Sequence, residues 1–224
     1  MSAAFVSKCI ITGKPMKTIL CFGDSNTWGF NARTQNRFSI DERWTGVLAT
    51  ELGAGFHVIE EGLNGRTTVW NDPVEGRMSG KDYLVPCLES HHPIDLVVLM
   101  LGTNDLKKRF AVSAYDIAMS VGVLIDIIQK STAGPNYRAP QVLLIAPPVV
   151  GKLSEYAEMF GDDAQARSKQ FAKYYLLIAK QYSCHFLDAA QVIVSGELDG
   201  VHFEADQHRK LGQAIAARVK EIFA

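Results

Sequence analysis

Short apolar runs alternate along the chain with longer segments in which apolar residues recur at helical spacing. Two of the runs, Leu96–Leu101 and Val142–Ala146, are almost wholly apolar, as expected for strands covered on both faces of a sheet. We therefore expect parallel, central strands. The predicted strands are Thr18–Phe22, His57–Glu60, Leu96–Leu101, Val142–Ala146 and His185–Leu187.

The segments between the runs carry stripes of apolar side chains that indicate helices. The clearest stripe consists of Ile117, Val121, Leu124, Ile125 and Ile128. Ser113 and Asp116 stand at its start as a variant of the capping box. A second stripe, in the last helix, consists of Leu211, Ile215, Val219 and Ile222, and weaker patterns predict helices over Arg43–Leu52, Lys81–Ser90 and Asp163–Gln181.

This alternation of strands and helices is typical of an α/β fold. We expect three layers, α/β/α, around a doubly wound, parallel, five-stranded sheet of the flavodoxin-like kind, joined by right-handed crossovers. In such a sheet the ligand lies beyond the carboxyl ends of the strands, near a topological switch point. Residues at those ends are therefore the first candidates for function.

The composition fits one domain. A chain of 224 residues that is 47% hydrophobic and 21% charged can bury a full core, so we expect a single domain over residues 16–224. The apolar residues within 1–15 are too few and too mixed for a signal peptide, and Met16 begins a more natural chain. We expect residues 1–15 to be a disordered extension or a mis-assigned start. No later segment approaches the roughly 18 to 20 apolar residues of a membrane helix.

The charge balance indicates a small, uncharged partner. The formal net charge is −1 without any basic or acidic block, so nothing predicts binding to nucleic acid or to an anionic membrane. The four cysteines are far apart and form no C-x-x-C pair, which favours buried thiols in a reducing compartment over disulfides or a zinc site. We expect a cytoplasmic protein. Because aliphatic helix faces serve a monomer core and an interface equally well, a homo-oligomer stays open.

Polar and glycine-rich blocks follow the predicted strands. The four blocks are Gly23–Ser25, Gly62–Gly65, Gly102–Asp105 and Asp199–His202. Because the carboxyl ends of parallel strands meet at one edge of the sheet, all four should face the same rim. Such a cluster at the edge of a hydrophobic sheet is typical of a binding or catalytic site.

Ser25 and His202 supply the chemistry that this rim would use. A serine hydroxyl is a nucleophile only if a base takes its proton, and Asp199 and His202 place a base and an orienting carboxylate on one short segment. Taken singly, Gly-Asp-Ser closes a turn after a strand and Asn104-Asp105 caps a helix. Their coincidence at one rim favours acyl transfer through a serine ester.

The remaining histidines carry no such pattern. His91 and His92 are adjacent, so they cannot share the face of a metal-binding helix, and we expect them in a loop or at a helix end. We expect His57, His185 and His208 at strand edges or on the surface. Gly13-Lys14 lacks the spacing of a phosphate loop. Neither a metal nor an organic cofactor is predicted.

In order and spacing, the four blocks resemble those of the SGNH (GDSL) hydrolase superfamily across nearly the whole chain. The stretches CFGDSNTWGF, RWTGVLA, VIEEGLNGRTT, DLVVLMLGTND and DGVHF are similar to its bacterial arylesterase/acyltransferase branch. The resemblance implies that Ser25 is the nucleophile, His202 the general base and then acid, and Asp199 the residue that orients the imidazole. It also implies an oxyanion hole made of the backbone N–H groups of Ser25 and Gly65 and the side-chain amide of Asn104.

The same resemblance suggests which residues meet the substrate. Trp28 would form a pocket wall, while Asn26 and Asn64 stand where the family commonly has leucine and serine, and so change the polarity beside the scissile bond. Asp24 would brace the nucleophile loop. Arg66 would either hold the second loop through a carboxylate or be a plain surface charge. Residues 149–160 lack the proline-rich extension of the branch.

We therefore expect a serine esterase that hydrolyses short-chain acetyl or aryl esters, with acyl transfer to alcohols as a second outcome. A carbohydrate O-deacetylase, a thioesterase and a lysophospholipase would use the same catalytic set. A silent binding module is disfavoured, because it would have no physical reason to keep Ser25, Gly65, Asn104, Asp199 and His202 together.

Overall fold

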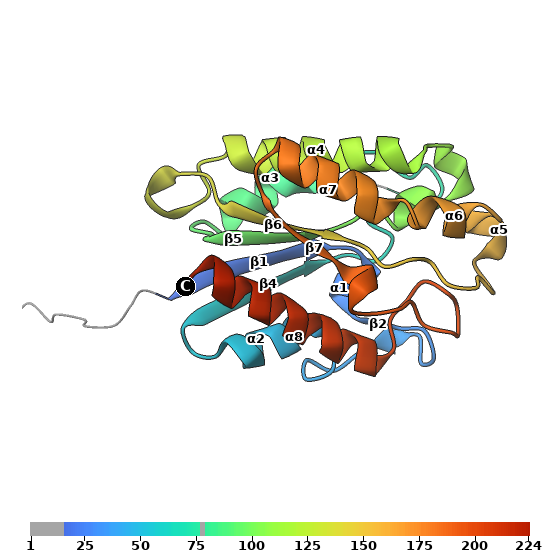
Figure 1. The fold of residues 1–224 in the computed structure, drawn as a ribbon, viewed down its shortest axis with the longest axis horizontal. Coiled ribbons are helices and arrows are strands. Elements are labelled where there is room, and N and C mark those ends of the chain that lie inside the picture. Colours follow the sequence, from blue (N-terminus) through green and yellow to red (C-terminus); the bar gives the residue numbers. More distant parts are fainter. Residues whose placement is uncertain (1–15, 77–78) are drawn as a thin grey trace, which may run out of the picture.

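A parallel sheet of five strands, in the order β4-β1-β5-β6-β7, forms the centre of the molecule in the computed structural model, which describes residues 16–76 and 79–224 (Figure 1). The strands are β1 (Lys17–Gly23), β4 (Phe56–Gly62), β5 (Leu96–Met100), β6 (Gln141–Ala146) and β7 (His185–Asp188). They coincide with the five predicted runs to within two residues at each end. A separate antiparallel ribbon joins β2 (Phe30–Asn31) to β3 (Asn36–Arg37). The expectation about residues 1–15 falls outside the described residues.

The strand order reverses between β1 and β5. The chain passes from β1 to β4 at one edge, returns to β5 on the other side of β1, and continues through β6 to β7. This is the doubly wound, flavodoxin-like order, and the prediction of the fold class is confirmed. The switch point therefore lies beyond the carboxyl ends of β1 and β5.

Helices cover both faces of the sheet. The helices are α1 (Ser25–Trp28), α2 (Trp44–Leu52), α3 (Gly80–Ser90), α4 (Ala114–Lys130), α5 (Ala157–Phe160), α6 (Ala164–Ser168), α7 (Phe171–Gln181) and α8 (Ala205–Ile222). The 3₁₀ turns are η1 (Asn104–Leu106), η2 (Lys108–Phe110), η3 (Pro135–Tyr137) and η4 (Ala189–Gln191). Figure 1 shows α3, α4 and α7 on one face and α2 and α8 on the other.

The side chains of the strands alternate between the two layers. In β1, Leu20 and Phe22 pack into the core beneath α3, α4 and α7, whereas Ile19 and Cys21 pack into the core beneath α2 and α8. All four are fully buried. Because side chains of a strand alternate between faces, a strand covered on both sides needs apolar residues at every position. This is why the central runs are continuous rather than alternating.

The predicted cap of α4 is present, but the helix predicted over Asp163–Gln181 is interrupted. At α4, the Ser113 hydroxyl accepts the backbone N–H of Asp116, whose carboxylate accepts the backbone N–H of Ser113. Further along, α6 ends at Ser168 and α7 begins at Phe171. The Ser168 hydroxyl donates to the Gln165 carbonyl and accepts the N–H of Val150, so it competes with the helical backbone at the break.

His208 is fully buried in α8, so the prediction that it lies at a strand edge or on the surface is wrong. Its Nδ1 accepts the backbone N–H of Trp44 at 3.3 Å, and its ring packs against Phe38 and Phe203. Burial lowers its pKa to about 3, so the imidazole is neutral at physiological pH. His208 therefore serves the packing of α8 on α2, whereas His57 and His185 lie on the edge strands as expected.

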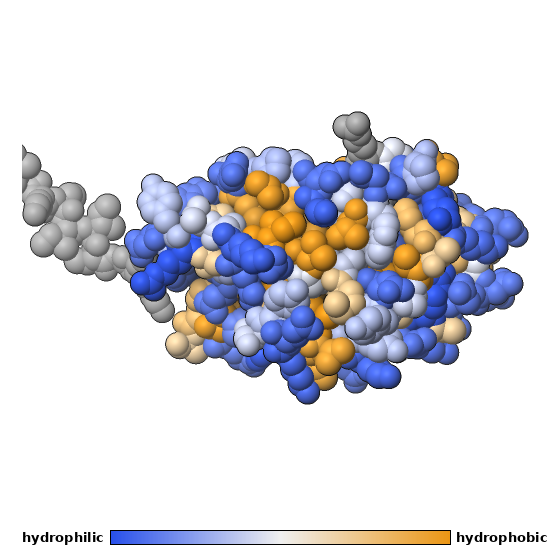
Figure 2. Space-filling model, turned by 90° about the horizontal axis from the view of Figure 1, so that it is seen from above, coloured by the Kyte–Doolittle hydropathy of each residue, from blue (hydrophilic) through white to orange (hydrophobic). Residues whose placement is uncertain are grey.

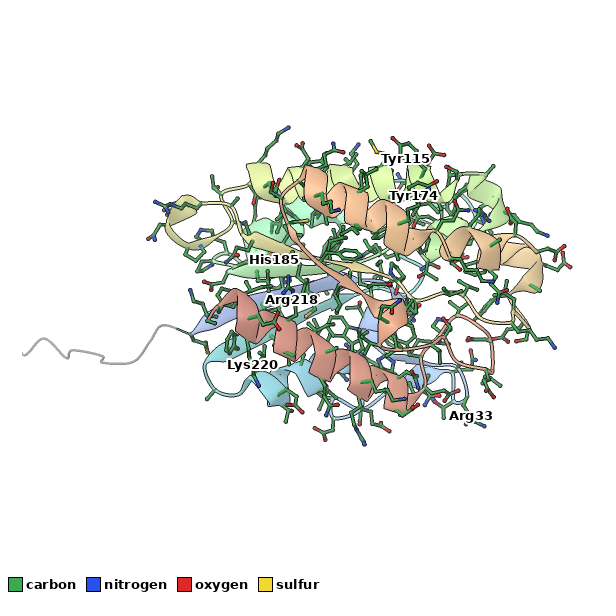
Figure 3. The ribbon with its side chains drawn as sticks, viewed as in Figure 1. Arg33, Tyr115, Tyr174, His185, Arg218 and Lys220 are labelled. Atoms are coloured by element: carbon green, nitrogen blue, oxygen red, sulfur yellow. The ribbon has the colours of Figure 1, made fainter. Side chains whose placement is uncertain are left out.

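The outer face of α4 carries exposed apolar side chains. Tyr115, Met119 and Val123 recur four residues apart and are each about two-fifths exposed. Figure 2 views this side of the molecule and shows apolar residues gathered near its centre. The rings of Tyr115 and Tyr174 meet edge to face between α4 and α7, with centroids 5.5 Å apart (Figure 3). Among the described residues, no helix combines the length and hydropathy of a membrane span.

Candidate active site

Ser25 is the first residue of α1 and directly follows β1 and Asp24. Asp24 caps the short helix, because its Oδ1 accepts the backbone N–H of Asn26 at 3.0 Å. Burial raises the pKa of Asp24 to about 6. At Gly23 a Cβ atom would lie 2.1 Å from the Thr27 hydroxyl, so only glycine fits ahead of this turn. The local sequence thus holds the Ser25 hydroxyl at the switch point of the sheet.

Hydrogen bonds within the Asp199–His202 segment hold it in a tight turn. Asp199 Oδ1 accepts the backbone N–H groups of Val201 and His202 at 2.8 and 2.9 Å. Gly200 has a φ of +81°, and a Cβ atom there would lie 2.5 Å from the Lys152 carbonyl. The tight turn therefore requires glycine at this position and leaves Oδ2 of Asp199 free for the imidazole.

The three polar side chains form one hydrogen-bonded series. His202 Nδ1 lies 2.6 Å from Asp199 Oδ2, and His202 Nε2 lies 2.9 Å from Ser25 Oγ. Burial alone would raise the pKa of Asp199, but the hydrogen bonds and charge of His202 outweigh it and lower the pKa below its ordinary value. Asp199 is thus a carboxylate at neutral pH, which favours a proton on Nδ1 and leaves Nε2 to accept the serine proton.

Asn26 joins the nucleophile to the histidine segment. Its Nδ2 donates to the Val201 carbonyl at 3.2 Å, and its Oδ1 accepts the Phe203 backbone N–H at 3.1 Å. The side chain is 2% exposed and does not line the cavity described below. The geometry therefore does not support the expected contact of Asn26 with substrate, since both ends of its amide are engaged across the chain.

The predicted oxyanion donors lie around Ser25. Gly65 and Asn104 line the same cavity as Ser25 and His202, and Gly65 has a φ of +77°. Asn104 Nδ2 donates to the Arg66 carbonyl at 3.2 Å, which leaves its second N–H. Within the described residues, the backbone N–H groups of Ser25 and Gly65 have no hydrogen-bond acceptor. Unpaired N–H donors that lie close together are typical of a site that binds an anionic oxygen.

A cavity of about 200 Å³ opens beside Ser25 and His202. Its apolar lining comprises Phe30, Tyr156, Met159, Phe160 and Val201, and its polar lining includes Asn64, Glu75 and Lys107. Phe30 packs on the imidazole of His202, with ring centroids 4.5 Å apart. The predicted wall residue Trp28 is not part of the lining; its ring lies against the Arg37 guanidinium instead.

Comparisons with known proteins agree with this geometry. Residues 21–210 match the family model of the GDSL-like lipase/acylhydrolase family. The chain belongs to this family. The family resemblance drawn from the four sequence blocks is thus confirmed, and so is the prediction of a serine hydrolase that acts on ester bonds.

Solved structures of this family resemble the whole fold. A carbohydrate acetylesterase from Sinorhizobium meliloti is 39% identical, with a TM-score of 0.88, over 92% of this chain and 100% of that one. An aryl esterase from M. smegmatis is 41% identical, with a TM-score of 0.86, over 92% of this chain and 99% of that one. A comparison with curated proteins finds no match.

In this GDSL-like hydrolase, Arg66 is 3% exposed and binds backbone carbonyls. Its Nη1 donates to the carbonyls of Gly23, at 3.0 Å, and Glu61. The guanidinium also packs on the rings of Phe22 and Tyr83. Arg66 is therefore not a plain surface charge, and since no carboxylate of the described residues forms an ion pair with it, backbone carbonyls take the place of the expected carboxylate partner. The side chain ties the carboxyl ends of β1 and β4 together next to the loop that carries Gly65.

Asp105 joins the second and third loops of the rim. It is fully buried, and its carboxylate accepts both the backbone N–H and the hydroxyl of Thr68. Burial, with a smaller contribution from the charge of Asp24, outweighs the hydrogen bonds from Thr68 and raises the pKa of Asp105 to about 6. Asp105 caps no helix here, because its acceptors face the loop that follows β4, not the start of η1.

Among the described residues, Glu61, Cys87 and His91 could together hold a metal ion. Glu61 already pairs with His91 at 2.7 Å, and the charge of Arg66 acts on both Glu61 and Cys87. A positive guanidinium beside the cluster disfavours a cation there.

Several residues that line the cavity have no signal in the sequence. Met159 lies in the short helix α5 and Tyr156 directly precedes it, but no element is predicted there, and Glu75 lies in a turn whose sequence is typical of an ordinary polar loop. Lys107 follows Asn104 by three residues, so its closeness to the third block is the one clue that it could reach the site.

Proposed function

We propose that the protein is a serine esterase that hydrolyses short-chain carboxylic esters through an acyl-Ser25 intermediate. The observation that best supports this proposal is the series Ser25 Oγ, His202 and Asp199, with separations of 2.9 and 2.6 Å, which opens onto the cavity. Because the free N–H groups of Ser25 and Gly65 lie beside it, nucleophile, base and oxyanion donors converge on one point.

In the first half of the reaction, Ser25 Oγ attacks the ester carbonyl while His202 Nε2 takes the hydroxyl proton. The C–O double bond becomes an oxyanion, which accepts hydrogen bonds from the N–H groups of Ser25 and Gly65 and from the Asn104 amide. The negative Asp199 stabilises the imidazolium. Collapse of the intermediate breaks the bond to the alcohol oxygen, which leaves with the proton from His202.

In the second half, water gives a proton to His202 as it attacks the acyl carbon. The bond to Ser25 Oγ then breaks, and the serine recovers its proton from the imidazolium. A bound alcohol in place of water would give a new ester, so acyl transfer to alcohols uses the same steps. The ratio of the two outcomes depends on which nucleophile occupies the cavity.

The size of the cavity favours a short acyl group. At about 200 Å³ it lies below the roughly 300 to 1,000 Å³ of pockets that enclose drug-sized ligands. An acetyl group fits within such a space, whereas a fatty acyl chain would have to extend beyond it. This argues against the lysophospholipase alternative and leaves a carbohydrate O-deacetylase as the second candidate, which the similarity to a carbohydrate acetylesterase favours.

A substrate panel tests the proposal. The wild-type protein should release acetate from an aryl acetate, and Ser25→Ala should lose nearly all of this activity while its circular dichroism stays unchanged. An organophosphonate should label the wild type once and Ser25→Ala not at all. Retained turnover in Ser25→Ala would reject the serine mechanism. Hydrolysis of an acyl-CoA, included in the same panel, would indicate a thioesterase.

Cytoplasmic location and self-association are further parts of this proposal. The described cysteines Cys21, Cys87 and Cys184 are free thiols, which supports a reducing compartment. The exposed apolar stripe of α4 supports contact with a second copy. Light scattering at micromolar concentration would detect the oligomer, and a monomer mass would reject it.

A further inference from the structure

One wall of the catalytic cavity carries an ion pair that the proposed mechanism does not use. Lys107 and Glu75 both line the cavity. The Lys107 side chain is 2% exposed and that of Glu75 is 27% exposed. Because an unpaired ammonium is costly to bury, Lys107 can occupy this position only with anionic partners.

The pair belongs to a four-residue charge cluster with no net charge. Lys107 Nζ donates to Glu75 Oε1 at 2.7 Å and lies 3.7 Å from Asp72 Oδ2. Arg109 donates to Asp72 Oδ1 at 2.9 Å and to Glu75 Oε1 at 3.3 Å. Asp72 Oδ1 also accepts the backbone N–H groups of Val74 and Glu75. The turn that carries Glu75 is therefore anchored before any substrate arrives.

The pair keeps unused hydrogen-bonding capacity. Within the described residues, Glu75 Oε1 takes both hydrogen bonds to that carboxylate, and Oε2 takes none. The Lys107 ammonium has three N–H groups, and Glu75 is its one hydrogen-bond partner in the described part of the chain. A donor and an acceptor are thus available side by side in the wall of the cavity.

This arrangement fits hydroxyl groups better than it fits any part of a simple acetate ester. A hydroxyl can accept from the ammonium and donate to the carboxylate at once, and a neighbouring hydroxyl can share the pair. The acetyl methyl group gains nothing from a charged wall and instead suits the apolar lining of Phe30, Tyr156 and Phe160. The hydroxyl groups must therefore belong to the alcohol part of the substrate.

We propose that Lys107 and Glu75 determine specificity for esters of polyhydroxylated ring alcohols, that is, partly acetylated sugars, by binding hydroxyl groups next to the acetylated oxygen. This inference rests on the proposed esterase function and deepens it. Aryl acetates would use only the apolar lining, so they would be turned over without help from the pair.

The test compares two acetates that differ in their hydroxyl groups. One is a mono-O-acetylated methyl xyloside with two free hydroxyls, and the other is cyclohexyl acetate, which has a ring of the same size and none. Wild-type kcat/KM should be at least tenfold higher for the sugar acetate. In the double variant Lys107→Met/Glu75→Gln, this preference should fall by about 10- to 100-fold, the range expected when hydrogen bonds to charged groups are lost.

The double variant removes one charge of each sign and so keeps the charge balance of the cluster. The double variant leaves the Asp72–Arg109 pair intact, and Glu75→Gln alone keeps an amide oxygen beside Lys107 in case the double variant does not fold. Lys108→Met is the matched control, because Lys108 is the adjacent lysine, has a side chain that is 54% exposed and does not line the cavity. The preference of Lys108→Met for the sugar acetate over cyclohexyl acetate should equal that of the wild type.

The outcomes separate the two proposals. If the folded Lys107 and Glu75 variants keep the wild-type preference, or lose both activities in parallel, the pair does not recognise hydroxyl groups and the inference is wrong. If the wild type shows no preference, the inference is likewise wrong although the esterase function stands. If the wild type hydrolyses neither ester nor an aryl acetate, the proposed function itself fails.

Discussion

Replacing Asn26 by alanine removes the two hydrogen bonds that join α1 to the segment carrying His202. The Val201 carbonyl and the Phe203 N–H, bonded now at 3.2 and 3.1 Å, would both lose their partner. Each polar group left unsatisfied in a buried position costs about 1 to 3 kcal/mol, so the free energy of unfolding should fall by roughly 2 to 6 kcal/mol. Since small domains are stable by about 5 to 15 kcal/mol, most of the variant should still fold at 25 °C.

The same change should lower catalysis through kcat. A small displacement of His202 from Ser25 weakens proton transfer, and a shift of about 1 Å can cost about 100-fold in rate. Urea unfolding gives the stability and steady-state kinetics gives kcat and KM. Asn64→Ala is the stability control, because Asn64 is exposed and makes no hydrogen bond to the described residues. A rise in KM with stability unchanged would refute the positioning role of Asn26 and support the substrate contact expected from the sequence.

Three further predictions follow from the site. Asp199→Asn should lower kcat by roughly 1,000- to 10,000-fold in a folded protein, because the amide disfavours the required tautomer of His202; a loss below tenfold would contradict this role. Asn104→Ala should lower kcat by roughly 100- to 1,000-fold, whereas a change confined to KM would assign Asn104 to binding alone. The pKa of Asp105 rises on folding from 3.8 to about 6, so its ionisation should cost about 3 kcal/mol of stability as the pH rises from about 4 to 6. Asp105→Asn should remove this loss, and parallel urea-unfolding profiles for variant and wild type between pH 4 and 7 would argue against it.

Much of the fold could be predicted because it depends on local patterns. The continuous apolar run of β5 and the helical spacing of the α4 stripe are each visible within a short stretch of sequence, and Ser113 and Asp116 mark the helix start three residues apart. The common rim also followed from strand direction alone. The break after Ser168 could not be predicted, since it involves Val150, eighteen residues away, as the partner of the serine hydroxyl.

Site residues could be predicted where the interacting side chains lie in one short segment. They could not be predicted where the hydrogen-bond partners are far apart in the sequence. Asp199 and His202 are three residues apart and could be paired from the sequence. The partners of Asn26 lie 175 and 177 residues away, so nothing local distinguishes a positioning amide from a substrate ligand. Arg66 and His208 look like surface residues by type, and only the packed structure shows how the carbonyls and aromatic rings around them permit their burial.

The central claim is that Ser25 carries the acyl group during turnover. Rapid quenching of the protein with an aryl acetate, followed by intact-mass measurement and peptide mapping, tests it most directly. We expect a fraction of the wild type to gain the mass of one acetyl group on the peptide that contains Ser25, and His202→Ala and Ser25→Ala to gain none. Turnover without any acylated protein, or an acetyl group on another residue with Ser25→Ala still active, would contradict the account.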